Sequence, residues 1–378
     1  MNGLVGLIPA AGRGTRMGSP FEGLPKPLVE IEGRPLLAHA LETLVGLGVA
    51  EIVVVTGHEA RLVERALAAM ACAVPVRTVR QSPLLGLAHA IAVARPLISG
   101  PLVVHCPDSL YRDLSDLRQA RDRFLARSPR ALQCVTVAPT GRSHRSAYDA
   151  FDGVLLETNL FSVGAGGRPG PLPLWSSGVI FLSPEALCGL PDFEGLSDEQ
   201  PFTRYVSSLR DAGPFLAHLL GSGRDDFTSS EDVDAYRRHG ESWGAAGGGT
   251  GVSIVLVGGD GRFLLHKRDD KPGIRYPGHW ALFGGSAEPG ETPAEAIRRE
   301  VREEIGYDLD CFGALRRFVH EGKREWAFVG RVTAGLERLT LQEGAGMAFF
   351  RPQEIPDLRI RPDDRETLLG YLGSGPDG

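Results

Sequence analysis

The segment GSAEPGETPAEAIRREVREEIG, residues 285–306, predicts a loop followed by one helix that ends at a glycine. Its residues 292–295, TPAE, form a capping box with proline at the first helical position. Glu300, Glu303 and Glu304 recur at i, i+3 and i+4, so they share one face of the helix. Carboxylates crowded in this way repel one another, but they suit a hard divalent cation, which prefers oxygen ligands. We therefore expect a metal site on this helix.

The same segment resembles the Nudix box, whose fixed positions are here Gly285, Glu291, Arg299, Glu300, Glu303, Glu304 and Gly306. The resemblance covers about residues 251–370 and implies a Nudix α/β/α sandwich with a mixed sheet. It implies attack of water, assisted by Mg²⁺, on a nucleoside diphosphate linked to another group.

The resemblance also implies a role for each motif residue. Glu300, Glu303 and Glu304 would bind the metal, and we expect Glu304 to activate the water. Gly285, Glu291 and Arg299 would support the loop and the helix. Glu343 lies where some family members place an additional ligand or base.

The N-terminal part of the chain alternates strands with helices. Apolar runs typical of buried strands, at residues 4–8, 51–57 and 102–106, are separated by segments with helical spacing. This alternation predicts a doubly wound, Rossmann-like parallel sheet. Ligands of such sheets bind at the carboxyl ends of the strands, so the loops that follow these runs are candidate binding loops.

A glycine-rich loop, residues 9–18, follows the first of these strands. Its glycines let the backbone approach a phosphate chain, and its N–H groups, with Arg13 and Arg16, would face the negative charge. Lys26 lies between two prolines and is one of only four lysines in the chain. The loop is not a Walker loop, because Gly-Lys-Ser/Thr is missing.

These features together resemble the sugar-nucleotide pyrophosphorylases, in particular the glucose-1-phosphate thymidylyltransferases, over about residues 1–240. The resemblance rests on GRGTRM at residues 12–17, on PKP at residues 25–27 and on QSPLLGLA at residues 81–88. It implies an NTP, a sugar 1-phosphate acceptor and Mg²⁺ as ligands. The implied catalytic residues are Arg16 and Lys26, the implied nucleotide-binding residues are Ala11, Gly12, Gly14, Thr15, Gln81 and Gly86, and the implied metal ligands are Asp108 and Asp226.

Three departures from this family's pattern concern the acceptor. The usual Gly-Asp-Asn around the metal aspartate is replaced by Pro107-Asp108-Ser109, and Asp225-Asp226 lacks the expected upstream Trp. The Glu-Lys pair at the sugar phosphate appears as Glu157-Thr158, without the lysine. An unusual sugar or cyclitol phosphate would fit these changes. The nearest cations in sequence that could replace the lysine are Arg142, Arg145 and Arg168.

The composition predicts two domains and small anionic substrates. The chain has 378 residues, of which 42% are hydrophobic, and its net charge of -6 comes without a basic block, so nucleic acid is not an expected partner. Five scattered cysteines favour a reducing, cytoplasmic location, and no apolar run approaches the roughly 20 residues of a membrane span. We expect domains at residues 1–240 and 251–378, joined by a flexible Gly-rich linker at 241–250.

The favoured interpretation is a bifunctional enzyme of nucleotide-sugar metabolism, for which assembly into a homo-oligomer is an open option. An alternative is a cytidylyltransferase for a non-sugar phosphate such as phosphocholine. Another is a regulatory module in which the Nudix fold senses a nucleotide without cleaving it. The three intact glutamates argue against a pure sensor.

Overall fold

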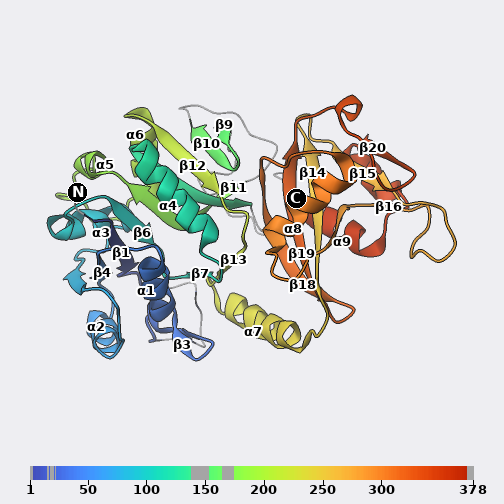
Figure 1. The fold of residues 1–378 in the computed structure, drawn as a ribbon. Helices are drawn as coiled ribbons and strands as arrows, with labels where there is room; N and C mark the ends of the chain where they lie inside the picture. The colour runs from blue at the N-terminus through green and yellow to red at the C-terminus, as the bar shows by residue number, and fades with distance from the viewer. Residues whose placement is uncertain are drawn as a thin grey trace.

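The computed structural model describes residues 3–14, 17, 21, 23–137, 153–163 and 174–372. It consists of two α/β domains side by side, an N-terminal one from blue to yellow-green and a C-terminal one in orange and red (Figure 1). Among the described residues, no helix is both long and apolar enough to cross a membrane.

The N-terminal domain, as far as it is described, is built on a nine-stranded sheet in the order β5-β4-β1-β6-β11-β8-β12-β10-β9. The strands β5, β4, β1 and β6 run parallel, whereas β11 runs antiparallel to both of its neighbours, β6 and β8. The predicted Rossmann-like fold is confirmed, and the mixed half of the sheet adds to it. The strand bounds are β1 (Val5–Ala10), β4 (Glu51–Thr56), β5 (Val76–Arg80), β6 (Leu102–His105), β8 (Ala131–Val137), β9 (Gly153–Glu157), β10 (Leu160–Val163), β11 (Leu174–Leu182) and β12 (Phe215–Leu219).

Helices cover both faces of this sheet because the side chains of its central strands alternate between two apolar cores. Ile8 of β1 packs into the core beneath one set of helices, and its neighbour Leu7 packs into the core beneath the other. The first set is α1 (Leu36–Gly46), α2 (Ala60–Ala68) and α4 (Ser115–Arg127), and the second is α3 (Leu87–Ala94), α5 (Pro184–Cys188) and α6 (Phe202–Asp211).

Short elements at one edge of this domain carry residues of the candidate site. They are the turn η3 (Lys26–Leu28) and the antiparallel ribbon of β7 (Ser109–Tyr111) and β13 (Arg224–Asp226). A second ribbon joins β2 (Glu30–Ile31) to β3 (Arg34–Pro35), and η4 (Arg95–Leu97) follows α3.

The C-terminal domain is built on a mixed sheet of seven strands in the described part of the chain. Its longest pairing is parallel, between β14 and β19, and the other pairings are antiparallel. Helices α8 and α9 pack on opposite faces, which confirms the predicted sandwich. The elements are β14 (Thr250–Gly258), β15 (Phe263–Lys267), β16 (Trp280–Ala281), β17 (Phe283–Ser286), α8 (Pro293–Ile305), β18 (Phe312–His320), β19 (Lys323–Val332), η5 (Leu336–Arg338), β20 (Gly346–Phe350), η6 (Pro352–Asp357) and α9 (Pro362–Leu372).

The predicted capping box at the start of α8 is confirmed. The hydroxyl of Thr292 accepts the backbone N–H of Glu295 at 3.2 Å, and the Glu295 carboxylate accepts the backbone N–H of Thr292 at 2.8 Å. Gly306 ends the helix in the left-handed conformation, with φ of 63°, which glycine adopts without steric cost.

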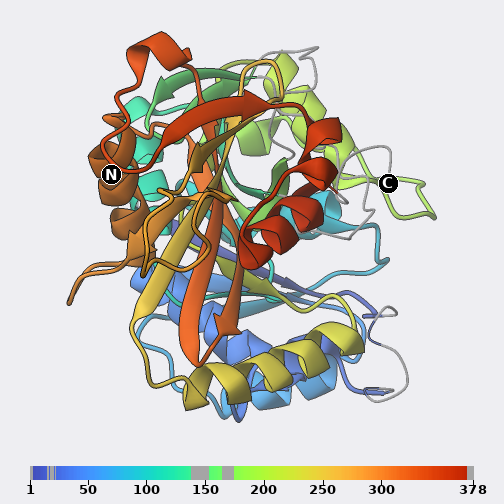
Figure 2. The same cartoon turned by 90° about the vertical axis from the view of Figure 1, so that its right-hand side faces the viewer.

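The two domains are joined by α7 (Ser230–Ala245), which lies against β18 at the foot of the C-terminal sheet (Figure 2). Half of the segment that the sequence predicts as a flexible linker is therefore helical, because the helix continues past residue 240. Only residues 246–249 separate α7 from β14. The domain limits at 240 and 251 stay a prediction.

The domains also share packing. One buried apolar cluster contains Val137 and Leu219 of the N-terminal domain together with Val255 and Leu315 of the C-terminal domain. Next to it, the side-chain oxygen of the buried Asn159 accepts the backbone N–H of Phe312 at 3.0 Å. A flexible tether would not require such an interface, so the two domains are packed as one body.

We expect residues 1–240 and 250–378, expressed as separate fragments, to be less stable than the same domains in the full chain. Separation would expose the shared cluster to water and replace the hydrogen bond between Asn159 and Phe312 by bonds to water. Thermal unfolding of each fragment beside the full chain, with near-UV circular dichroism for fixed packing, checks this. Fragments that unfold at the temperature of the intact protein would show that the interface contributes nothing.

Stability should also depend on His218 of β12, which is completely buried. Burial, with the charges of Arg123 and Arg298, lowers the pKa of His218 to about 3. An unfolded histidine takes up a proton near pH 6.5, so the free energy of unfolding should fall as the pH drops below that value, by about 1.4 kcal/mol at pH 5.5. Urea unfolding at pH 7.5 and 5.5 measures this. In His218→Gln the fall in unfolding free energy that comes from His218 should vanish. An unchanged fall in this variant would contradict the lowered pKa of His218.

Two candidate active sites

The first candidate site is a cavity of about 440 Å³ at the carboxyl ends of β1 and β6. The structure brings to it the predicted residues Ala11, Gly12, Gly14, Lys26, Gln81, Gly86 and Asp108. Thr15 and Arg16 lie outside the described residues, so the structure says nothing of their predicted roles.

The backbone of this cavity is shaped by glycines. Gly14 has a φ of 63°, and a side chain there would bring its Cβ within 3.1 Å of the Cβ of Lys26. Gly86, at the start of α3, has a φ of 89°, and its Cβ would lie 2.8 Å from the carbonyl oxygen of Gln200. Both positions therefore need glycine for the close approach of two chain segments.

Lys26 and Asp108 meet inside this cavity. The Lys26 Nζ lies 2.6 Å from the Asp108 Oδ2, and both side chains are largely buried. Burial opposes the charge on Asp108, but the charge and the hydrogen bond of Lys26 hold the pKa of this carboxyl below its ordinary value. A cation and an anion are thus fixed beside the glycine loop.

Gln81 is buried, and its amide is used within the protein. The Gln81 Nε2 donates to the carbonyl oxygen of Gly86 at 2.9 Å and lies 3.1 Å from the Nδ1 of His89. These contacts fix the loop before α3. The predicted contact of Gln81 with a nucleobase stays a prediction.

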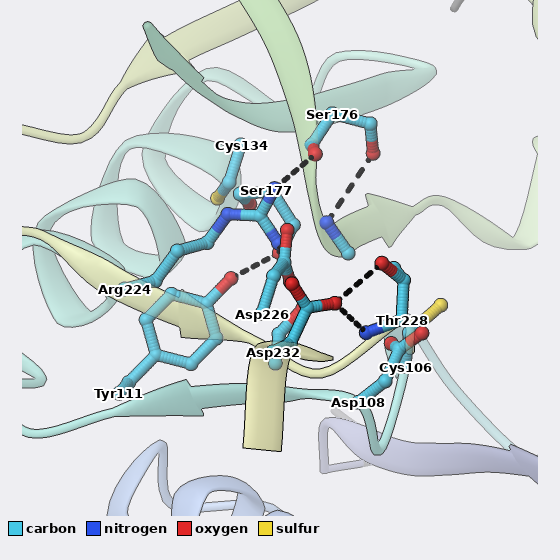
Figure 3. Close-up of polar contacts among 12 residues, drawn as sticks. Cys106, Asp108, Tyr111, Cys134, Ser176, Ser177, Arg224, Asp226, Thr228 and Asp232 are labelled. Atoms are coloured by element: carbon cyan, nitrogen blue, oxygen red, sulfur yellow. Dashed lines mark hydrogen bonds and ion pairs between the residues drawn. The ribbon is translucent and has the colours of Figure 1, made fainter. Parts of the chain in front are cut away.

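Asp226 lies on β13, close to Asp108 (Figure 3). Its Oδ1 accepts the hydroxyl of Ser109 at 2.8 Å and forms an ion pair with Arg224. Burial raises the pKa of Asp226; the charge of Arg224 opposes this shift, and the charge of Asp108 adds to it. The two predicted metal aspartates are therefore close enough for the negative charge of one to disfavour ionisation of the other.

Arg224 is a site residue that sequence reasoning missed. Its side chain is only 8% exposed and donates to the hydroxyl of Ser109 at 2.8 Å and to the carbonyl oxygen of Ser176 at 3.0 Å. A signal was present, because residues two apart on a strand share a face, and Arg224 precedes Asp226 by two.

The structure does not bring Glu157 and Thr158 to this cavity. Glu157 ends β9 and forms ion pairs with Arg123 and Arg127 of α4 instead. Within the described part of the chain, neither residue lines the cavity. The three arginines proposed as replacements, Arg142, Arg145 and Arg168, lie outside the described residues.

The second candidate site is the start and inner face of α8. Arg299 donates to Glu291 at 3.0 Å, to Glu300 at 2.9 Å, to Glu303 at 3.0 Å and to the carbonyl oxygen of Ser286 at 2.9 Å. This one guanidinium ties the loop to the helix; the supporting role expected of Arg299 and Glu291 stays a prediction. It also offsets the repulsion expected between Glu300 and Glu303.

Glu304 stands apart from that network. Its Oε2 accepts the backbone N–H of Gly284 at 2.9 Å. Burial raises the pKa of Glu304 to about 8, to which the charges of Glu300 and Glu343 add. A Cβ at Gly285 would lie 2.4 Å from the Glu300 Oε1, so the glycine of the motif makes room for this carboxylate.

The carboxylates of Glu300, Glu303 and Glu304 are the kind of ligand that a hard cation prefers, but their oxygens do not converge on one point. Among the described residues, no three His, Cys, Asp or Glu side chains converge in an arrangement that could hold a metal ion. However, Glu304 is a buried carboxyl with a raised pKa, which a cation would favour in its ionised form. The side chain of Glu303 is 60% exposed, so it has room to break its ion pair with Arg299 and bind the same cation as Glu304.

Next to Gly285 lies a smaller cavity of about 260 Å³ that the sequence did not indicate. Lys323 and Arg361 line it, and so does the fully buried Asp364. Asp364 accepts the backbone N–H of Leu282 at 3.0 Å and pairs with Arg361 at 3.2 Å. Cations beside the motif suit a phosphate chain.

Comparison with known proteins finds a matching family model for part of each domain. Residues 248–370 match the NUDIX domain, and residues 6–177 match the MobA-like NTP transferase domain. The nucleoside triphosphatase NudI of Escherichia fergusonii is 53% identical over 131 residues, which are 31% of this chain and 92% of NudI. The bifunctional protein GlmU of Paracidovorax citrulli is 47% identical over 100 residues, which are 26% of this chain. The chain spans only 20% of the length of that GlmU.

A solved structure supports the N-terminal fold. A UTP-bound UGPase from Acinetobacter baumannii superposes with a TM-score of 0.51 at 22% identity, over 63% of this chain and 93% of that one. The N-terminal domain therefore has a nucleotidyltransferase-like fold, and the C-terminal domain matches the NUDIX domain. Through its C-terminal domain the chain belongs to the Nudix family, with NudI among its relatives.

Glu304 should make the stability of the metal-free protein depend on pH. Its carboxyl keeps its proton up to about pH 8 in the fold but only up to about pH 4.5 when unfolded. The free energy of unfolding should therefore fall as the pH rises through this window. Glu304→Gln should remove that fall, and the exposed Glu337→Gln should keep it. Urea unfolding at pH 6 and 9 in EDTA measures it, and identical pH dependence in all three proteins would refute the buried state of this carboxyl.

Proposed function

We propose that the chain is a bifunctional, Mg²⁺-dependent enzyme. Its N-terminal domain transfers a nucleotidyl group from an NTP to a sugar or sugar-like 1-phosphate, releasing pyrophosphate. Its C-terminal domain hydrolyses a nucleoside diphosphate derivative, for which the name of its NudI relative suggests a nucleoside triphosphate. The observation that carries the proposal is the meeting of Lys26 and Asp108 inside the glycine-lined cavity.

In the transferase reaction an oxygen of the acceptor phosphate forms a bond to the α-phosphorus, and the bond from that phosphorus to the pyrophosphate oxygen breaks. Mg²⁺ held by Asp108 and Asp226 would neutralise charge on the phosphates. The backbone of the glycine loop positions the NTP, and the ammonium of Lys26 donates to the departing phosphates. No covalent nucleophile of the protein is required.

In the hydrolase reaction Glu304 would accept the proton of the attacking water. Burial makes its carboxylate a stronger base than one at the surface. Glu300 and Glu303 would complete the oxygen ligands of Mg²⁺, and Lys323 and Arg361 would hold the phosphate chain beside Gly285.

A screen tests the proposal. The five common NTPs are each incubated with Mg²⁺ and with glucose 1-phosphate, inositol 1-phosphate or phosphocholine, and products are separated by chromatography. Nucleotidyl transfer to a sugar or cyclitol phosphate supports the assignment. Transfer from CTP to phosphocholine alone would favour the cytidylyltransferase alternative. Hydrolysis of nucleoside triphosphates is followed in the same mixtures.

Lys26→Ala should abolish nucleotidyl transfer and leave nucleotide hydrolysis intact. The ammonium stabilises charge in the transition state, and loss of such a preorganised group costs about 3–4 kcal/mol, or roughly 10²–10³ in turnover. Pyrophosphate release measures it. The exposed Lys271→Ala is the matched control, and Glu304→Gln should show the opposite pattern, with transfer kept and hydrolysis lost. Transfer at the wild-type rate in Lys26→Ala would remove Lys26 from the mechanism.

Glucose 1-phosphate should be a poor acceptor. The position expected to supply a phosphate-binding lysine is Thr158, and Glu157 beside it is paired to α4. A lost charge-assisted phosphate contact costs about 1.5–3 kcal/mol, or roughly 10- to 150-fold in kcat/KM relative to the best acceptor of the screen. Steady-state kinetics with both acceptors measure the ratio. Equal efficiency would show that another cation replaces the lysine.

A further inference from the structure

A larger cavity, of about 640 Å³, lies between the two domains. Its N-terminal walls come from the ends of β7 and β8, from the turn before β13 and from α7. Its C-terminal walls come from the start of α8 and from β18 and β19. The volume falls within the range of about 300–1,000 Å³ that is typical of small-molecule sites.

This cavity meets the transferase centre at Asp226 and has a lining different from that of the nucleotide cavity. Asp226 lines the interdomain cavity, whereas Asp108 lines the nucleotide cavity with the glycine loop. The two aspartates lie close together, because the backbone N–H of Phe227 donates to the carbonyl oxygen of Asp108 at 2.9 Å. Nucleotidyl transfer brings two substrates to one phosphorus atom, so the second substrate needs its own approach to this carboxylate pair.

We propose that the acceptor of nucleotidyl transfer binds in the interdomain cavity, so that the C-terminal domain supplies one wall of the transferase site. The inference rests on the proposed transferase activity. It deepens that activity by assigning the acceptor site and its chemistry: a phosphomonoester whose organic part presents an apolar or ring-shaped surface.

Arginines on the wall of the cavity suit the phosphate of such an acceptor, which would share them with the carboxylates that they already pair with, Glu32, Asp225 and Asp226. Arg224 lines the cavity beside Asp226 and is only 8% exposed. The guanidinium groups of Arg112 and Arg317 lie 5.6 and 5.9 Å from the centre of the Tyr236 ring, on the same cavity. The planar guanidinium group of arginine matches the geometry of phosphate oxygens.

The remaining walls suit an organic ring. Tyr236 comes from the N-terminal domain, and Trp326 and Phe328 come from the C-terminal domain. Val137 and Ala314 add aliphatic surface. Aromatic rings with a few placed polar groups are the usual lining of pockets that hold small organic molecules.

The C-terminal domain also fixes the strand that carries Asp226. Asp225 points to the other side of β13 from Asp226, and both of its oxygens accept from the Arg317 Nη2, at 2.6 and 2.5 Å. These side chains are 20% and 16% exposed. A largely buried pair of this kind holds β13 in register with the wall of the cavity.

The experiment fills the cavity in the full chain. Ala314→Phe adds a ring from the C-terminal wall, Ala235→Phe adds one from α7, and Ala212→Phe adds the same ring at an exposed position of the N-terminal domain away from the cavity. Glucose 1-phosphate, inositol 1-phosphate and phosphocholine are the acceptor probes. Binding of each is measured by calorimetry, and transfer is measured with the NTP that is most active with the wild type.

The filled variants should raise the KM and Kd of the acceptor by about tenfold or more and leave the KM of the NTP and nucleotide hydrolysis within about twofold. Intact hydrolysis shows that the variants are folded. Wild-type acceptor affinity in both filled variants, or binding of none of the three probes to the wild type, overturns the inference. Acceptor binding that the filling abolishes, without transfer by the wild type, would uphold the site and refute the proposed reaction.

Discussion

The ion pair between Asp225 and Arg317 is the contact that ties the packing of the two domains to the transferase centre. It joins a strand of three residues, β13, to the long strand β18 of the neighbouring domain. Because side chains alternate along a strand, the same three residues face two ways. Asp225 faces the C-terminal domain, while Arg224 and Asp226 face the transferase centre. A contact made for packing therefore also fixes the position of a carboxylate proposed to bind metal.

Local sequence patterns predicted what depends on neighbours along the chain. The capping box, the three glutamates on one helix face and the glycine loop after β1 each follow from residue spacing, and the structure contains all three. Gly12, Gly14 and Asp108 of the nucleotide cavity were predicted to be neighbours because parallel strands end at one edge of a sheet. The resemblance to known families supplied Asp226, whose neighbourhood to Asp108 depends on a ribbon formed across more than a hundred residues.

What the sequence did not predict depends on partners far apart in the chain. We expected Glu300 and Glu303 to repel each other, but the guanidinium of Arg299 donates to both of them. The hydrogen bond of this guanidinium to the carbonyl oxygen of Ser286 holds it in that orientation. Composition made residues 241–250 look flexible, yet packing against β18 keeps α7 helical to Ala245. Glu157 was aligned with a ligand of the acceptor, but its salt bridges to α4 place it elsewhere. In each case a tertiary contact overrides a local tendency.

The buried cluster that passes from Leu219 to Leu315 has a consequence for the exchange of domains by recombination. A protein whose domains are connected only by flexible linkers can exchange one domain for a homologous one without changes in the other. Here a foreign Nudix module would have to match the surface of β8 and β12, the carboxamide of Asn159 and the charge of Asp225 at once. Substitutions on one side of this interface therefore require matching substitutions on the other. A working chimera would have to take the strands β12 and β18 and the helix α7 from the same parent protein.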